Sequence, residues 1–542
     1  MMVKLVNTIN HVQTAFAISV VALLAALILM DTSVSPACAS CGDPAAVNVD
    51  WSYCDNQRAN LSNFRLTLAN LSYGNLTNAN LTNAYLMMAN LRSANLSGAR
   101  LVKANLTGAD LNGTTLANAD LTGVTGLSNL QLHNVSSLQG ANLSALDLSG
   151  FDLSSGNLTG AKLTSADLTG ADLTSADLTG ANLNGANLNG ANLNKVNLKG
   201  AVLTGVNNLT GAQLRSASNL QGVNLSGLNL SSFDLSSFEL TGAVLTNAVL
   251  SNADLTNTDL TNANLSGTNL TGASFAGANL TGANLTKTNI TDFQLHSAAF
   301  LKGVNLSGLK LSNFEMRFLI LPGANLSNAD LTNVDLRGSD LTKADLRVSD
   351  LTNANLTLSN LAGANLTKAD LTKADLTSTD LANTNLTEAN LNKSNMTKAN
   401  LNKAILTGVT NLSAAQLRSA SNLEGVNFSG LNLSYFDLNL LILNEANLSK
   451  TNLTDTNLAD ANLSKTNLSD ANLTNANLSK TNLSNANLTN ANLSNAILTD
   501  TNLTDAKLTG TIGVSSELPN SDKPDSLKTS PVTPGGGPGL TN

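Results

Sequence analysis

The stretch Ala-Asp-Leu-Thr-Gly-Ala-Asp-Leu-Thr at 166–174 contains one five-residue unit and most of a second, and Ala-Asn-Leu-Asn-Gly-Ala-Asn-Leu-Asn at 181–189 continues the pattern. The same unit, A-[N/D]-L-[S/T]-x, recurs from Asn60-Leu61 to Leu508. Self-similarity at a fixed period is the signature of proteins built by stacking short repeats. This repeat decides the fold, and the other parts of the sequence are interpreted around it.

A period of five fits neither an α-helix nor a straight β-strand. Five helical residues advance by about 500°, so successive Leu residues would spread over every face of a helix. In a straight strand the side chains alternate with a period of two, so successive Leu residues would point to opposite faces. All the Leu side chains point inward only if the chain turns once in each pentad. Ala and Leu then face inward, Asn or Asp points outward, and Ser or Thr forms the corner with the variable residue.

These runs resemble the pentapeptide-repeat family, and the resemblance covers nearly all of 59–510. It implies an all-β fold, namely a right-handed quadrilateral β-helix with four pentads in each coil. The central residues of the pentads, nearly all Leu, form five tracts that contain eighty units and predict about 20 or more coils: 61–121, 143–203, 225–300, 306–406 and 428–508. A single pentad buries too little apolar surface to stay ordered alone, so we expect stability to come from neighbouring coils.

Four interruptions break the phase of the repeat, and they are alike. The intervals Leu121 to Leu143, Leu203 to Leu225 and Leu406 to Phe428 are equal in length, and Leu285 to Leu306 is one residue shorter. Each interval therefore resembles one coil of four pentads with one or two extra residues. All four contain Gln-Leu followed by a basic residue or His, and these residues are candidate docking positions: His133, Arg215, His296 and Arg418. A bulge that simply exposes a solvated corner explains the same residues, because each charge is isolated and no aromatic residue accompanies it.

The coil that follows each interruption carries larger residues where the inner Ala normally stands. The replacements are Leu and then Phe: Leu146 and Phe151, Leu228 and Phe233, Leu309 and Phe314, Leu431 and Phe436. We expect a wider coil whose bore these side chains fill, because unfilled space in a core costs stability. The phase of the third tract also predicts that Phe300 takes an inner position in place of Leu.

The N-terminal segment 1–39 differs in composition from the repeats. Ala15 to Met30 is an apolar run, interrupted only by Ser19, that is too short for a membrane span of about 20 residues. It is followed by Ala37-Cys38-Ala39, a cleavage site of the A-x-A type. We expect a signal peptide cut near Ala39 and an exported protein that is periplasmic, at the cell surface or secreted. Two alternatives are an uncleaved membrane anchor and a lipoprotein acylated at Cys38 or Cys41.

The two ends of the repeat region have their own character. We expect residues 40–58 to cap the repeats and residues 512–542, with five Pro residues and three consecutive Gly residues, to form a disordered Pro/Gly/Ser tail. Cleavage near Ala39 would leave Cys41 and Cys54, which can pair as a disulfide in an oxidising compartment. Two independent thiols remain the alternative.

Composition argues against catalysis and against binding to nucleic acid. Only 3% of the 542 residues are aromatic, 12% are charged and three are His, and the formal net charge is −8. His133 and His296 would lie about eight coils apart, too far to share a metal ion or a catalytic dyad. A nucleic-acid partner would need a basic stripe that neutralises phosphates. We therefore expect no enzymatic activity, no metal and no cofactor.

The sequence favours an exported, non-enzymatic solenoid that acts as a structural or protein-interaction surface. Its partner would be an unknown protein or a second copy of the chain, and it would contact a membrane only if segment 1–39 is retained. The resemblance implies one alternative, because some pentapeptide-repeat proteins mimic DNA and bind DNA gyrase. The outward Asn residues, the Lys residues and the expected export oppose that alternative. A second alternative is an ordered Ser, Thr and Asn surface that binds ice or polysaccharide.

Overall fold

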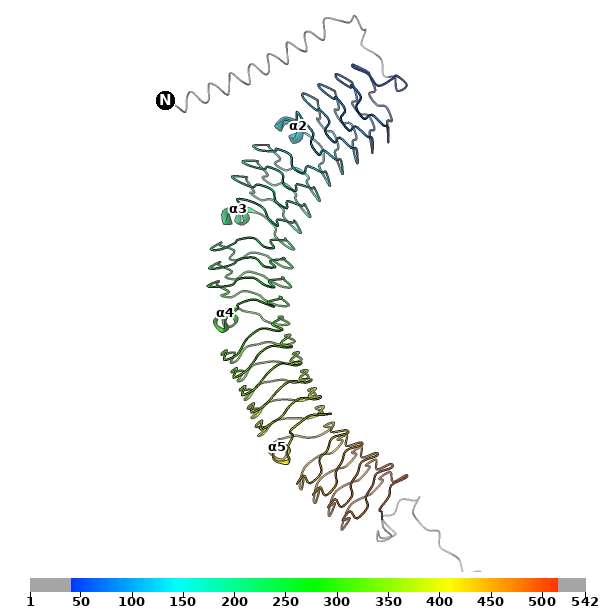
Figure 1. The fold of residues 1–542 in the computed structure, drawn as a ribbon, viewed down its shortest axis with the longest axis vertical. Helices are drawn as coiled ribbons and strands as arrows, with labels where there is room; N and C mark the ends of the chain where they lie inside the picture. The colour runs from blue at the N-terminus through cyan, green and yellow to red at the C-terminus, as the bar shows by residue number, and fades with distance from the viewer. Residues whose placement is uncertain (1–39, 515–542) are drawn as a thin grey trace, which may run out of the picture. The chain divides into compact units, whose positions relative to one another are not determined.

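The computed structural model describes residues 40–514. The expected signal peptide or membrane anchor at 1–39, including Cys38, and the expected tail from residue 515 onward lie outside the described residues. The chain divides into two compact units, Met1–Lys162 and Leu163–Asn542, and each is described by itself (Figure 1). Both units are built from the same pentad, so one account of the pentad serves for both.

Each pentad contributes a single bridge residue to a parallel ladder rather than a long strand. Bridge partners within the repeats are separated by four pentads, as Asp50 and Asn70 are in the first unit and Asn447 and Asn467 are in the second. Each residue therefore stacks on its equivalent four pentads earlier. The described residues form a parallel β-helix, as the period of five predicts.

The corner of each pentad is a tight turn closed by a backbone hydrogen bond. The N–H of Ala166 donates to the carbonyl oxygen of Leu163 at 3.0 Å. Ser165, the third residue of that turn, has a φ of 56°. Gly and Asn adopt this left-handed region most readily, which explains why they are so frequent at the variable position of the pentad. The β-branched Val348 has a φ of 59° at the same position, and its backbone is strained there.

Columns of Leu and Ala fill the interior of both units. Leu96 in the first unit and Leu463 in the second are fully buried, with exposed fractions of 0%. At the beginning of the first unit, Trp51 takes the place of Leu and Cys54 the place of Ala, with exposed fractions of 5% and 1%. Regular stacking therefore begins at Asp50, within the segment that the sequence assigned to a separate cap, although that segment lacks the Ala-Asn-Leu pattern.

Each interruption of the repeat forms a single helical turn, which the sequence analysis did not predict. The helices are α2 (Asn129–His133) in the first unit, and α3 (Gly211–Ser216), α4 (Asp292–Ser297) and α5 (Ala414–Ser419) in the second (Figure 1). Bridge partners are separated by four pentads plus two residues across α2, α3 and α5, and by four pentads plus one across α4, as in Asn284 with Asn305. The helical turns thus absorb the extra residues and leave the ladder in register.

The expectation of a wider, Phe-filled bore after each interruption is wrong for the Phe residues. The Leu residues that begin these coils are buried, with Leu228 at 7% exposure, but Phe151, Phe233, Phe314 and Phe436 are only half-buried. A Cβ placed on Gly211 would lie 3.4 Å from the ring of Phe233, so that ring lies against the first residue of α3. The extra residues leave the coil as a helix, and the Phe side chain covers that helix instead of filling the bore.

The predicted inner position of Phe300 is also wrong. Phe300 is a bridge residue on the outer surface with an exposed fraction of 61%, and Leu301, at 4%, takes the inner position after α4. The pentad phase shifts by one residue here because the α4 interruption adds a single residue. Leu295, counted as part of the third tract, is buried within α4.

Candidate functional site

A capping box begins each helical turn. In α3 the Thr210 hydroxyl accepts the N–H of Gln213 at 3.2 Å, and the Gln213 side-chain oxygen accepts the N–H of Thr210 at 2.8 Å. Equivalent boxes begin the other three helices: Ser128 with Gln131, Thr291 with Gln294, and Ser413 with Gln416. This Ser/Thr-x-x-Gln spacing is the sequence signal that would have predicted the helices.

The Gln side chain also fastens each helix to the preceding coil. In α3 the Nε2 of Gln213 donates to the carbonyl oxygens of Leu188 at 2.7 Å and Ala191 at 2.9 Å. In α5 the Nε2 of Gln416 donates to Leu391 at 2.7 Å and to Ser394 at 3.0 Å. These carbonyl groups belong to the coil that the helix covers. The carbonyl oxygens of Leu188 and Leu391 also accept a turn N–H, whereas those of Ala191 and Ser394 have no other hydrogen-bond partner within residues 40–514.

The four candidate docking residues lie in the last turn of each helix and contact the following coil. Three of them face an acid: His133 lies 3.3 Å from Asp152, Arg215 lies 3.1 Å from Asp234, and Arg418 lies 2.7 Å from Asp437. His296 instead has its Nδ1 3.0 Å from the carbonyl oxygen of Asp292 and its Nε2 3.2 Å from that of Arg317. Each residue acts within its own helix-and-coil pair, and the structure does not bring the four together.

The acids that hold three of these basic residues were missed by the sequence analysis, although they recur. Asp152, Asp234 and Asp437 each follow the Phe of the coil after the helix, and Glu315 has the same place after α4 but pairs with Arg317. Hydrogen bonds from the side chain and backbone of Ser236 lower the pKa of Asp234, burial opposes them slightly, and the charge of Arg215 lowers the pKa further. Ser154 and, to a smaller extent, His133 lower the pKa of Asp152 in the same way. The carboxylates of Asp152 and Asp234 are therefore ionised around neutral pH.

Two hollows lie beside the helices. A groove of about 460 Å³ borders α3 and is lined by Arg215, Ser218, Asn219, Phe238 and Glu239. The guanidinium of Arg215 lies 5.6 Å from the centre of the Phe238 ring, a cation–π contact. A smaller hollow of about 280 Å³ borders α2 and includes Leu127, Leu146 and Phe151. The guanidinium of Arg215 in the larger groove is paired with Asp234.

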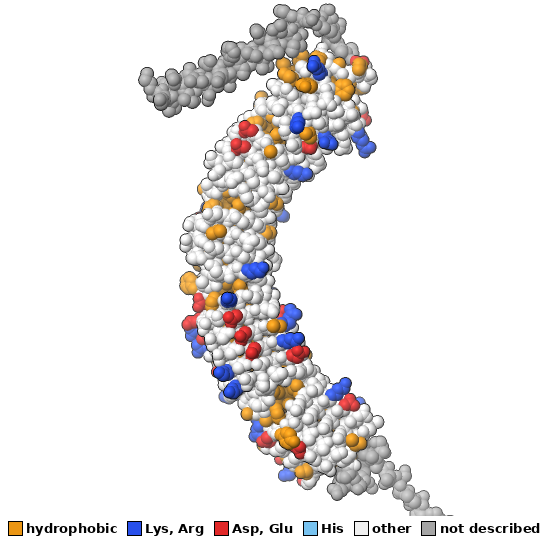
Figure 2. All heavy atoms as spheres, in the orientation of Figure 1, with side chains coloured by type: hydrophobic (Ala, Val, Ile, Leu, Met, Phe, Trp, Pro, Cys, Tyr) orange, Lys and Arg blue, Asp and Glu red, His pale blue; other side chains and the backbone are white. Residues whose placement is uncertain are grey.

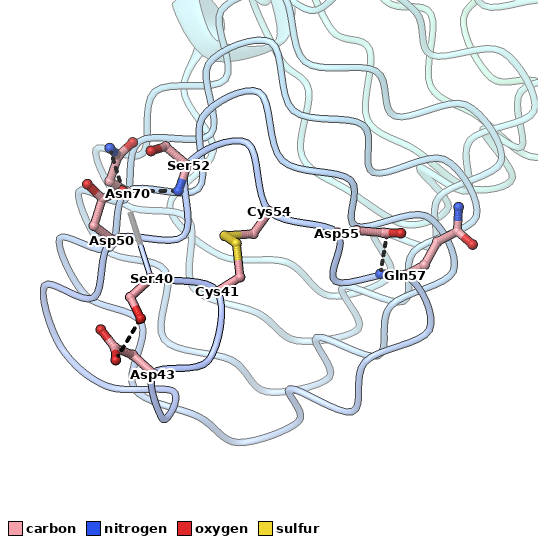
Figure 3. The surroundings of a disulfide bond; sticks show 9 residues. All are labelled: Ser40, Cys41, Asp43, Asp50, Ser52, Cys54, Asp55, Gln57 and Asn70. Atoms are coloured by element: carbon pink, nitrogen blue, oxygen red, sulfur yellow. Dashed lines mark hydrogen bonds between the residues drawn. A yellow bond between two sulfur atoms is a disulfide. The ribbon is translucent and has the colours of Figure 1, made fainter. Parts of the chain in front are cut away.

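A disulfide joins Cys41 to Cys54 at the beginning of the first unit, with their Cα atoms 5.5 Å apart (Figure 3). Cys54 occupies an inner position of the first coil, and Cys41 precedes that coil. Near them the hydroxyl of Ser40 donates to Asp43 at 3.0 Å. The bond therefore fastens the incoming chain to the first stacked coil.

Two acids in the middle of the second unit, Asp335 and Asp345, are neutralised by neighbouring arginines. Asp335 is held by Arg337 at 2.6 Å and lies 3.5 Å from Arg317, and Asp345 is held by Arg347 at 2.6 Å. The hydrogen bond from Arg337 is the main cause of the lowered pKa of Asp335, and partial burial opposes it. These two acids are therefore charge-compensated. In the neighbouring row, Asp330, Asp350 and Asp370 are bridged across successive coils, and none of the three forms an ion pair within residues 40–514.

Two further searches of residues 40–514 gave no site. Across this part of the chain, no group of three or more His, Cys, Asp or Glu side chains is arranged to hold a metal ion. The same residues contain no helix with the length and apolar character needed to cross a bilayer. The features with definable chemistry are therefore the helical turns, the disulfide and the charged surface.

The family model for pentapeptide repeats matches most of the chain. The matched segments together cover 57–86, 89–125, 136–222, 224–296, 299–408 and 421–512. The chain therefore belongs to the pentapeptide-repeat family. The unmatched gaps include residues 126–135 and 409–420, which contain α2 and α5 respectively.

Several solved pentapeptide-repeat structures are similar to parts of the chain. HetL, a protein involved in heterocyst differentiation regulation in the cyanobacterium Nostoc, is 29% identical over 39% of this chain and 88% of its own, with a TM-score of 0.19. Rfr23 from the cyanobacterium Cyanothece is 31% identical over 20% of this chain and 84% of its own, with a TM-score of 0.17. QnrB1, a plasmid-mediated fluoroquinolone resistance protein, is 19% identical over 39% of this chain and 91% of its own, with a TM-score of 0.18. No curated protein sequence matches the chain significantly.

Proposed function

We propose that the chain is an exported, non-enzymatic solenoid whose outer surface serves a structural or protein-interaction role. In this proposal four pentads close one quadrilateral coil, and the solenoid extends over about 20 or more coils, as the eighty units of the sequence imply. Segment 1–39 directs export or anchors the chain, and the residues after the last coil form a polar tail. The partner is a protein or a second copy of the chain.

The observation that carries this proposal is the internal pairing of the outward polar side chains. The Nδ2 of Asn467 donates to the Oδ1 of Asn447 at 3.1 Å, and Asn487 donates to Asn467 at 3.1 Å, so one amide ladder crosses three coils. The Thr474 hydroxyl donates to Asn472 within its own pentad at 2.7 Å. Groups that are hydrogen-bonded in this way stiffen a surface and are poorly suited to catalysis.

The contacts that the outward side chains make with one another weigh against the DNA-mimic and the ice- or polysaccharide-binding alternatives. A DNA mimic requires dense negative charge over a long surface. Asp335 and Asp345 each hold an arginine. The row of acids without an ion pair in residues 40–514, at Asp330, Asp350 and Asp370, is short, because Lys310 precedes it and Asn390 follows it. An ice- or polysaccharide-binding surface requires hydroxyl groups that can donate to the ligand, whereas hydroxyls such as that of Thr474 already donate to Asn or Asp. A rigid surface for a protein partner is compatible with both observations.

Fractionation of native cells, with the N-terminus of the protein determined by mass spectrometry, tests this proposal. We expect the chain in an exported or membrane fraction, with a mature end near Ser40 or an intact Met1 respectively. Size-exclusion chromatography of that fraction should place it in an assembly larger than the monomer. An intact monomeric chain in the cytosol would overturn the proposal and make a gyrase assay the next experiment.

A further inference from the structure

The first coils of the chain carry an excess of positive charge, most of it on arginine. Residues 56–109 contain five basic side chains and no Asp or Glu, whereas the whole chain has a formal net charge of −8. The five are Arg58, Arg65, Arg92, Arg100 and Lys103, and all are exposed. A local excess of positive charge in an acidic protein is a physical feature that attracts an anionic partner.

These basic groups also differ from the other arginines in how they are used. Within residues 40–514, the side chains of Arg58, Arg65, Arg92 and Arg100 form no ion pair or hydrogen bond. The remaining five arginines all pair with an acid: Arg215, Arg317, Arg337, Arg347 and Arg418. The chain thus neutralises its arginines in the later coils and leaves them unpaired in the first ones.

Three of the free cations lie close together. Arg65 is bridged to Tyr85, which places both in one row of outward residues. Arg100 is bridged to Asn80 and so belongs to the neighbouring row. Asn105 is bridged to Tyr85 and continues the row of Arg65. Lys103 lies at the corner of the chain between Arg100 and Asn105. Coils are about 4.8 Å apart, so Arg65 and Lys103 are separated by only two coils, roughly 10 Å. We call Arg65, Tyr85, Arg100 and Lys103 the basic face.

Exposed aromatic side chains accompany these cations. Tyr85 is 49% exposed and Phe64, beside Arg65 in the sequence, is 40% exposed. On another corner of the same coils, Tyr53 and Tyr73 stack with ring centres 4.8 Å apart and are 74% and 50% exposed. Figure 2 shows hydrophobic side chains beside Lys and Arg on the surface of the first coils. Amphipathic aromatic rings beside Arg and Lys are the residues that proteins place at the interface between a bilayer and water.

We propose that the basic face binds anionic phospholipid headgroups and holds the first coils against a bilayer. The apolar run that ends at Met30 lies only nine residues before Ser40, a maximum reach of about 30 Å. Whenever that run enters a bilayer, the basic face is confined near the headgroups. If the chain is cut near Ala39, the new amino group adds a further positive charge beside the first coil. The proposal therefore applies whether segment 1–39 is retained or cleaved, and it does not rest on the proposed function.

A bilayer fits the basic face better than a long polyanion does. Non-specific binding to nucleic acid depends on many phosphate contacts, typically about 6–10 along a continuous stripe, and the basic face offers three cations. Anionic lipids can diffuse within the bilayer to a small cluster of positive charges. Each Lys or Arg near the membrane surface contributes about 1 kcal/mol to the binding free energy, which is roughly a fivefold change in affinity.

The experiment measures partitioning of the purified full-length chain onto vesicles. One set contains phosphatidylcholine alone and the other contains phosphatidylcholine with phosphatidylglycerol. The test variant carries Arg65→Gln, Arg100→Gln and Lys103→Gln. The matched control carries Lys393→Gln, Lys398→Gln and Lys403→Gln, which removes three exposed positive charges from the second unit. Any contribution of segment 1–39 is common to all variants, so the ratio of binding to the two vesicle types isolates the basic face.

We expect the wild type and the control to prefer the anionic vesicles, and the test variant to lose about 100-fold of that preference. High salt should abolish the preference of the wild type, which provides a test that needs no variant. Equal binding of the wild type to both vesicle types, or an unchanged preference in a folded test variant, would overturn the proposal. Binding to dextran sulfate or single-stranded DNA without binding to anionic vesicles would overturn it in favour of that polyanion.

Discussion

Replacing Gln131 by Ala should loosen α2 far more than replacing Gln139, an exposed glutamine a little further along the chain. The Nε2 of Gln131 donates to the carbonyl oxygens of Leu106 and Ala109, both at 2.8 Å, and its Oε1 accepts the N–H of Ser128 at 2.6 Å. Gln131 is 8% exposed, so water does not easily replace these bonds. The side chain of Gln139 makes no hydrogen bond within residues 40–514.

The size of the effect follows from these three hydrogen bonds. Each contributes about 1 kcal/mol net. One of them satisfies the carbonyl group of Ala109, which has no other hydrogen-bond partner within residues 40–514, whereas the carbonyl oxygen of Leu106 also accepts the N–H of Ala109. We therefore expect Gln131→Ala to cost about 3 kcal/mol of local stability. At about 1.4 kcal/mol for each factor of ten, that cost corresponds to a more than 100-fold increase in local opening.

Native-state hydrogen exchange followed by mass spectrometry is the appropriate assay, because a repeat solenoid opens locally and a melting temperature averages over many coils. Peptides that cover residues 126–138 should exchange more than 100-fold faster in Gln131→Ala than in the wild type. Gln139→Ala should leave them within a factor of about two. Equal exchange in the two variants would refute the view that this amide fastens the helix to the preceding coil.

Three further predictions concern the disulfide, backbone strain and pH. Reduction of the Cys41–Cys54 bond should weaken the first coil by about 3 kcal/mol, and unchanged hydrogen exchange over residues 40–58 would contradict its clamping role. Val348→Asn should stabilise its coil by about 1 kcal/mol in the same assay, because Val348 is 53% exposed and has a φ of 59°, whereas the reverse change Asn353→Val should destabilise. The hydrogen bond from Arg347 lowers the folded-state pKa of Asp345, so its contribution to stability is present above the unfolded pKa of about 4 and is lost as the pH falls through the lower folded value. Urea unfolding monitored by hydrogen exchange in peptides around Asp345 should show this loss of stability as the pH falls. In Arg347→Gln most of this pH dependence should be absent.

The stacked coil could be predicted because a single physical constraint determines it. A period of five buries every Leu only if the chain turns once in each pentad, and residues such as Leu96 and Leu463 are accordingly buried. The beginning of the stack could not be placed from this pattern. Trp51 and Cys54 take inner positions there without belonging to an Ala-Asn-Leu unit.

The helical turns could have been predicted from capping chemistry but not from hydrophobic period. Residues such as 211–216 form too short a segment to show a helical apolar stripe, whereas Thr210 and Gln213 have the spacing of a capping box. The candidate docking residues lie in the last turns of these helices, and their docking role stays a prediction. Their partners, such as Asp437 for Arg418, lie almost one full coil further along the chain, and only knowledge of the coil length connects the two.

The spacing of the helices in the second unit explains how they interrupt the solenoid without disturbing it. Gln294 follows Gln213 by four coils plus one residue, and Gln416 follows Gln294 by six coils plus two residues. These additional residues, one and two, are the same as those that separate bridge partners beyond four pentads across α4 and α5 respectively. Every helix in this unit therefore interrupts the same row of bridge residues, where its Gln bonds the coil before it and its basic residue contacts the coil after it. An insertion that repairs the ladder on both sides can recur at whole-coil intervals, because the coils between the helices need no adjustment to accommodate it.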